Sequence, residues 1–183
     1  SPYRWFMHFN LAWGCLLAFA VTFPLVFGWL HFENPLGHKD LYQLVVFGFP
    51  VQIFNPEGII GFLFFNALNF CSVMVIIGTV MAFTRRFFNT GEMAIQTFAH
   101  DFLPLLILFS VAATGLFLTF SNHFLGGAHY RVLTTIHCWT VVMLFVYLPF
   151  GKFFHIFQRA AQMGAALYIE EKEFGKPALC IRC

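Results

Sequence analysis

The sequence has few charged residues. Asp, Glu, Lys and Arg make up only 10% of its 183 residues, whereas a soluble domain carries about 25%. Hydrophobic residues make up 60% of the chain, and the mean hydropathy is +0.77. This composition excludes an ordinary soluble domain and indicates one domain of an integral membrane protein. The net charge of +2 and the absence of any basic run argue against binding of nucleic acid.

Two further signals are missing. The first apolar stretch is too long for the core of a signal peptide, and no small-residue cleavage site follows it, so we expect no cleaved leader. The chain shows no internal repeat, which disfavours a transporter built from two matched halves. Three of the five cysteines (Cys15, Cys71 and Cys138) lie within apolar stretches, where packing is their expected role.

Four apolar stretches are long enough to cross a bilayer, which takes about 20 helical residues. We expect transmembrane helices at about residues 5–32, 58–84, 98–120 and 132–157. Leu41–Phe54 is apolar but too short to span and is broken by Pro50, so we expect an interfacial or re-entrant segment there. The predicted fold is all-α: a four-transmembrane-helix bundle over residues 1–160, followed by a polar, helical tail at 161–183.

The charges at the ends of the spans predict the orientation. With four antiparallel spans, one side carries eight Lys or Arg residues and the other carries only Lys39 and Arg131. Because cytoplasmic loops are enriched in Lys and Arg, both termini are predicted to be cytoplasmic. The eight residues are Arg4, Arg85, Arg86, Lys152, Arg159, Lys172, Lys176 and Arg182.

The last predicted helix carries a histidine near each end. His137 and His155 are 18 positions apart, which is five turns at about 3.6 residues per turn and about 27 Å of helix. Both imidazoles are therefore expected on one helix face, at opposite boundaries of a hydrocarbon core about 30 Å thick. Because an unpartnered imidazole in lipid is unfavourable and neutral imidazole is a good axial ligand, haem iron is a candidate partner. Hydrogen bonds to backbone or water are the alternative.

The predicted topology sorts the other histidines by depth. An inner haem is expected between His155 and His8, with His100 as the alternative partner of His155. An outer haem is expected between His137 and His123, with His129 as the alternative. We therefore predict one or two haem b groups, two being favoured. On the second predicted span, Asn66, Asn69 and Ser72 recur every three residues, so this polar face is expected to point into the bundle.

A quinone site requires an apolar slot with a few polar groups that exchange protons. The outer candidates are Glu57 and Arg131, and the inner candidates are His100 and Asp101. Ordinary polarity at headgroup level is the alternative for each. The outer set also includes Asn55, Asn122, His123 and His129.

Near the C-terminus, Cys180 and Cys183 form a C-x-x-C pair. Its spacing is that of half a zinc or iron–sulfur site, which would need further ligands from a partner. Unligated thiols are the alternative.

The stretch from His137 to Arg159, which contains LPFGKFFHIFQR, resembles the last helix of the respiratory nitrate reductase gamma subunit. It is similarly close to the membrane cytochromes of heterodisulfide reductase and dissimilatory sulfite reductase complexes. DFLPLLILFSVAATGLFLTF also resembles the preceding helix of that superfamily. The resemblance implies that His137 and His155 ligate two b haems and that an earlier helix supplies their partners.

The resemblance further implies a membrane subunit in the cytoplasmic membrane of a bacterium or archaeon. Such a subunit carries electrons between quinone or quinol and a peripheral iron–sulfur subunit. The chain departs from the nitrate reductase type, which has two histidines ten apart on its first ligand helix, because the position ten after His8 is Ala18. That type also has one more N-terminal helix. A haem-free anchor of a redox complex and a small transporter with a histidine proton relay remain the alternative functions.

Overall fold

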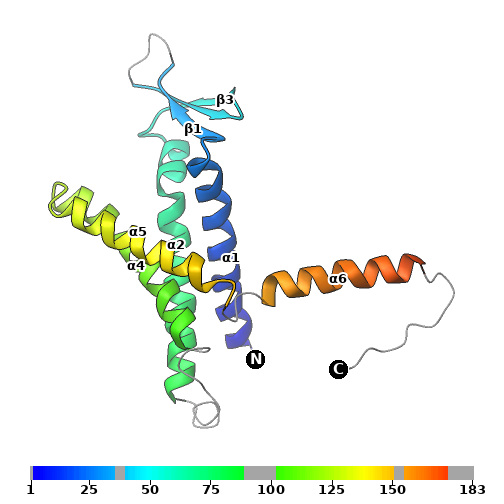
Figure 1. Cartoon of the computed structure of the whole chain (residues 1–183). Helices are drawn as coiled ribbons and strands as arrows, with labels where there is room; N and C mark the ends of the chain where they lie inside the picture. The colour runs from blue at the N-terminus through cyan, green and yellow to red at the C-terminus, as the bar shows by residue number, and fades with distance from the viewer. Residues whose placement is uncertain (1, 36–39, 89–101, 151–154, 173–183) are drawn as a thin grey trace.

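A computed structural model describes residues 2–35, 40–88, 102–150 and 155–172 of the chain. The helices are α1 (Pro2–Val26), α2 (Ile59–Phe88), α4 (Leu103–Phe124), α5 (Tyr130–Tyr147) and α6 (His155–Lys172). The first four are long and apolar enough to cross a membrane. This agrees with the predicted multi-pass helical bundle, in which α1, α2, α4 and α5 are the spans (Figure 1).

Consecutive spans pack as antiparallel neighbours. The N-terminal end of α1 meets the C-terminal end of α2, where the Tyr3 hydroxyl donates to the Met81 carbonyl over 2.9 Å. Helix α4 runs back along α2, and α5 runs back along α4. Two small clusters form the core: Met7, Ala82 and Leu105, and Val75, Leu108 and Ala112. Helix α2 contributes to both clusters and is therefore the central element of the bundle.

Glycine allows α1 and α2 to approach closely. A Cβ atom at Gly14 would lie 2.8 Å from Val75 Cγ2, and one at Gly78 would lie 2.7 Å from Leu11 Cγ. Both separations are too short for a side chain at either position. The backbones of α1 and α2 therefore lie closer together than any residue with a Cβ atom at these positions would allow. Small residues at helix interfaces are the usual means of close packing in membranes, where the hydrophobic effect does not drive helices together.

The segment predicted to be interfacial or re-entrant is part of a small β-sheet. Strands β1 (Leu30–Glu33), β2 (Tyr42–Val46) and β3 (Phe49–Phe54) pair antiparallel in the order β1-β2-β3. The sheet lies at the end of the α1–α2 pair (Figure 1). An apolar run of this length fits a strand as well as a short helix. Pairing with β1 favours the strand, because it provides hydrogen-bond partners for the backbone N–H and C=O groups of β2. The fold is therefore not purely helical.

The first span is shorter than the sequence suggested. It was expected to reach residue 32, but α1 ends at Val26 and Leu30–Glu33 is strand β1. Gly28 has a φ of 70° and its N–H donates to the Leu25 carbonyl, which is how a glycine ends a helix. The third span extends further than predicted, to Phe124, and ends just before Gly126 and Gly127, which both have positive φ.

The prediction of one continuous helix over residues 132–157 is wrong. Helix α5 ends at Tyr147 and the chain turns at Leu148–Phe150. Pro149 explains the end of the helix, because its ring clashes with the preceding turn and it has no N–H to donate. His155 is the first residue of a separate helix, α6, which projects away from the bundle (Figure 1). His137 and His155 therefore do not share one helix face.

Candidate functional site

The candidate site is centred on His137, which lies on the side of α5 that faces α4. Its Nδ1 atom is 2.9 Å from the Thr114 hydroxyl oxygen of α4. The Thr114 hydroxyl also lies 2.7 Å from the Ser110 carbonyl of its own helix, which can only accept. Because a threonine hydroxyl has a single proton, its donation to Ser110 leaves its oxygen to accept from the N–H of His137. With this direction of the bond, Nδ1 carries the proton and Nε2 carries the lone pair.

A second threonine completes the polar contacts of His137. The Thr140 hydroxyl donates to the His137 carbonyl over 2.8 Å, one turn along α5. Its oxygen lies 3.4 Å from that of Thr114, so three polar side chains meet between two membrane helices. We call His137, Thr114 and Thr140 the histidine cluster. An imidazole held in this way has a fixed ring orientation, which is a requirement for a metal ligand.

Gly115 of α4 lies where α2 and α5 both approach α4 near the histidine cluster. A Cβ atom at Gly115 would lie 3.4 Å from His137 Cε1 and 3.8 Å from the Ser72 hydroxyl oxygen. The same Cβ atom would lie 4.0 Å from His137 Nδ1, so Gly115 faces the Cε1–Nδ1 edge of the imidazole. Gly115 thus lets the ring lie against α4 beside Thr114.

The predicted polar face of α2 does point into the bundle. Asn69 accepts a hydrogen bond of 2.8 Å from the Thr119 hydroxyl of α4 and donates one of 3.0 Å to Asn66. Asn66 donates in turn to the Phe62 carbonyl. We call Asn66, Asn69 and Thr119 the asparagine ladder. It joins α2 to α4 about one turn beyond Gly115.

The other predicted haem ligands lie apart from His137. His8 is exposed on α1, next to the buried Met7, and His129 is exposed at the start of α5. His123 is exposed near the end of α4, nine residues beyond Thr114, which is about 13 Å of helix. No hydrogen bond joins any two of these histidines in the part of the chain that the structure describes. Among the proposed ligands whose side chains the structure describes, only His137 is held between two helices of the bundle.

Cys15 of α1 and Leu144 of α5 pack against the same core cluster around Val75. Cys15 lies seven residues from His8, on the helix face that the two residues share. Cys15 and Leu144, which lies two turns beyond His137, therefore pack on the same core cluster.

The predicted outer quinone residues lie at the surface. Glu57 is exposed just before α2, where its N–H donates to the Asn55 side chain. Arg131 is exposed on α5 and borders a shallow, largely apolar concavity along that helix. The residues that line it are Tyr130, Arg131, Thr134, Thr135, Cys138, Trp139 and Val142.

Several predicted residues lie outside the described part of the chain. They are His100, Asp101, Cys180 and Cys183, together with the side chain of His155. Their predicted roles as haem, quinone or metal ligands stay predictions.

Three threonines that the sequence does not single out take part in these contacts: Thr114 and Thr140 in the histidine cluster, and Thr119 in the asparagine ladder. Their signal is weak, because threonines in membrane helices commonly bond to their own backbone. Thr140 lies three residues after His137, which is the one spacing that could have suggested a shared face.

No family model matches the chain, and no curated protein or solved structure matches it.

Proposed function

We propose that the protein is a haem b-containing membrane subunit that carries electrons between quinone or quinol and a peripheral iron–sulfur subunit. The observation that carries this proposal is the contact between His137 Nδ1 and Thr114 within a bundle of four apolar helices. Histidine that ligates a metal characteristically donates its other ring N–H to a protein acceptor. His137 meets this condition, and its Nε2 is left for the iron.

The donor chemistry of His137 therefore fits haem b. His137 with His123 or His129 would hold the outer haem, and His155 with His8 or His100 would hold the inner one. Bound haem would supply a one-electron iron couple. In this arrangement Thr114 would hold Nδ1, and Gly115 would let the Cε1–Nδ1 edge of the ring lie close to α4.

A quinone would meet the bundle either at Arg131 and Glu57 or at His100 and Asp101. The concavity on α5 supports the first choice, because it sets one cation beside an apolar, aromatic surface. A C-terminal zinc or iron–sulfur site on Cys180 and Cys183, shared with the partner subunit, belongs to the same proposal.

The test is the dithionite-reduced minus oxidised spectrum of the purified full-length chain, with haem quantified per polypeptide. His137→Ala and His155→Ala are each expected to remove a haem, and the control His31→Ala is expected to remove none. His31 is a suitable control because it lies on strand β1, where it contacts Gly28 and Glu33 rather than a helix.

Loss of haem in the His155→Ala variant alone would reduce the proposal to a single inner haem. Folded wild-type protein without haem would contradict the cytochrome proposal. It would leave the haem-free anchor and the proton-relay transporter, which a proton-flux assay in liposomes would separate.

A further inference from the structure

The turn between β2 and β3 has an unusual residue in a demanding position. Phe47 and Gly48 form this two-residue turn with φ values of 51° and 82°. Asn-Gly is the favoured pair for such a turn, and a bulky residue with positive φ is a true outlier. The backbone at Phe47 is thus strained where asparagine would be relaxed.

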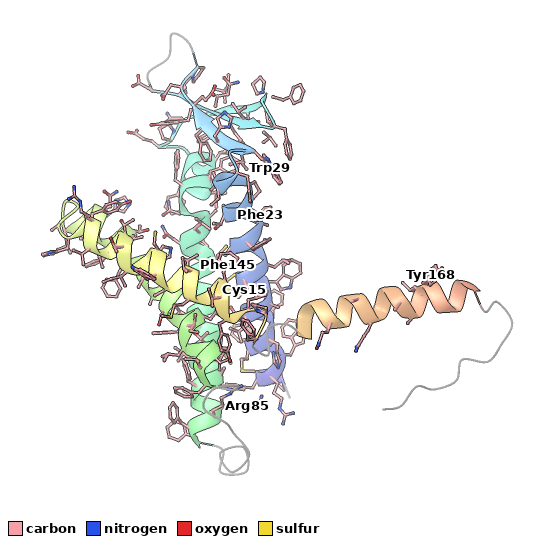
Figure 2. All side chains as sticks on the ribbon, in the orientation of Figure 1. Cys15, Phe23, Trp29, Arg85, Phe145 and Tyr168 are labelled. Atoms are coloured by element: carbon pink, nitrogen blue, oxygen red, sulfur yellow. The ribbon has the colours of Figure 1, made fainter. Side chains whose placement is uncertain are left out.

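The turn is attached to the end of α1. The Phe47 N–H donates to the Trp29 carbonyl over 2.7 Å, and the two ring centroids are 5.6 Å apart. Trp29 also stacks on Phe27 at 5.3 Å and lies edge-on to Phe23 at 5.8 Å. Figure 2 shows Phe23 and Trp29 in succession along the end of α1 beneath the sheet. A continuous aromatic track therefore leads from a membrane-spanning helix to the tip of the hairpin.

Arginines at the opposite end of the α1–α2 pair indicate where the aromatic residues lie relative to the hydrocarbon core. Arg85 lies far from Trp29 along the bundle (Figure 2). A hydrocarbon core is crossed by about 20 helical residues. Twenty residues after Arg4 on α1 is Pro24, and twenty residues before Arg85 on α2 is Phe65. These two residues therefore mark the far boundary of the hydrocarbon core. Trp29 follows Pro24 by five residues, at the headgroup level where tryptophan is enriched in membrane proteins.

The two ends of the sheet differ in chemistry. Residues 41–54 contain no Asp, Glu, Lys or Arg, and their aromatic tip is 67% exposed at Phe47 and 72% exposed at Phe49. The charged residue of β1, Glu33, pairs with Gln43 at the other end of the sheet. The apolar end therefore lies beside the end of α1, and the charged end lies away from it.

We propose that the Phe47–Gly48 turn, with Trp29 and Phe49, is an aromatic wedge that inserts between lipid headgroups of the adjacent leaflet. Its partner is the boundary between headgroups and acyl chains, where amphipathic aromatic rings are most stable. The wedge would hold the sheet against the bilayer and fix the height of α1 and α2. This inference rests on the membrane placement of the two helices and is independent of haem.

Photo-crosslinking in vesicles tests the wedge. Benzoylphenylalanine is introduced at position 47 of the full-length chain, with position 33 as the matched control on the charged end of the sheet. The probe is a vesicle of phosphatidylethanolamine and phosphatidylglycerol. On illumination, lipid adducts detected by mass spectrometry are expected to be several-fold more abundant at position 47 than at position 33.

Benzoylphenylalanine at position 49 is a second variant for the same test. Position 49 lies outside the strained turn, so this variant is expected to fold even if the variant at position 47 does not. Lipid adducts at position 49 would support the wedge in the same way. Equal labelling of positions 33 and 49 would overturn the proposal. In native membranes, an adduct on another polypeptide instead of lipid would also overturn it, because the surface would then be a protein interface.

Discussion

The two helix pairs of the bundle are built on different principles. The α1–α2 pair is joined by close backbone contacts at Gly14 and Gly78 and is closed at one end by the sheet. The α4–α5 pair is joined through polar side chains, with His137 and Thr114 in contact. Helix α1 buries residues against α2, whereas no residue of α5 is buried. The first pair forms a rigid frame, and the second holds the candidate ligand at the edge of that frame.

The proposed function would give this difference a chemical reason. A cofactor ligand needs an accessible nitrogen and space beside it, and tightly packed glycine contacts would leave neither. Under that proposal, steric packing would keep the first pair stable, and polar contacts in the second would leave α5 free to meet a cofactor. If this division holds, the largest effects on stability should come from α1–α2, and the largest effects on haem binding should come from α4–α5.

The largest loss of stability is expected for Gly78→Leu. The new side chain would overlap Leu11, because a Cβ atom at position 78 would lie 3.0 Å from the Leu11 backbone nitrogen, which cannot move aside. Overpacking of this kind typically costs about 1–3 kcal/mol of unfolding free energy, and more where backbone must shift. The measurement is unfolding by sodium dodecyl sulfate in mixed micelles.

The matched control is Gly164→Leu on α6. No atom lies within 4 Å of a Cβ at that position, so no loss is expected. Equal stability of the two variants would show that α1 and α2 do not depend on close approach at Gly78.

A smaller change in stability but a clear change in haem binding is expected for Thr114→Val. The substitution keeps the shape of the side chain and removes the acceptor of the His137 N–H. Loss of a hydrogen bond between membrane helices costs on average about 0.6 kcal/mol. Loss of the group that orients a metal ligand weakens metal binding by about 10- to 100-fold. Haem retention during titration with apomyoglobin, together with the reduction potential, measures the second effect.

Thr134→Val is the matched control, because the Thr134 hydroxyl donates to the Tyr130 carbonyl of its own helix. It should behave like the wild-type protein in both measurements. If Thr114→Val were indistinguishable from this control, Thr114 would have no part in positioning His137.

The parts of the fold that follow from local pattern were predictable from the sequence. Charge-free apolar runs indicate the four spans, and the spacing of Asn66, Asn69 and Ser72 indicates the inward face of α2. The sheet could not be predicted in this way. Strand β1 has only four residues and continues an apolar run, so only its pairing with β2, across the intervening turn, distinguishes it from helix.

The same limit applies to the candidate site. His137 stands out in the sequence because an imidazole in an apolar run is rare. The 18-residue spacing to His155 invited the inference of a shared face, but Pro149 ends α5 before that spacing is reached. Thr114 could not be distinguished from Ser110 or Thr119, since all three lie on the same helix and only the packing of α5 selects one of them.

The smallest expected effect concerns the asparagine ladder, which links the two pairs. A double-mutant cycle of Asn69→Leu and Thr119→Val measures the coupling of α2 to α4 through their 2.8 Å hydrogen bond. Couplings of this type in membranes average about 0.6 kcal/mol. A cycle of Asn69→Leu with Thr135→Val is the control, because Thr135 bonds to the Arg131 carbonyl of its own helix. This control should be additive within about 0.3–0.5 kcal/mol.

The outcome of that cycle separates two ways of attaching the second pair to the frame. A coupling that exceeds the control means that the hydrogen bond between Asn69 and Thr119 helps to hold α4 on α2, in addition to the apolar contacts. A coupling equal to the control means that α4 is held on α2 by its apolar contacts, chiefly Leu108 and Ala112 against Val75.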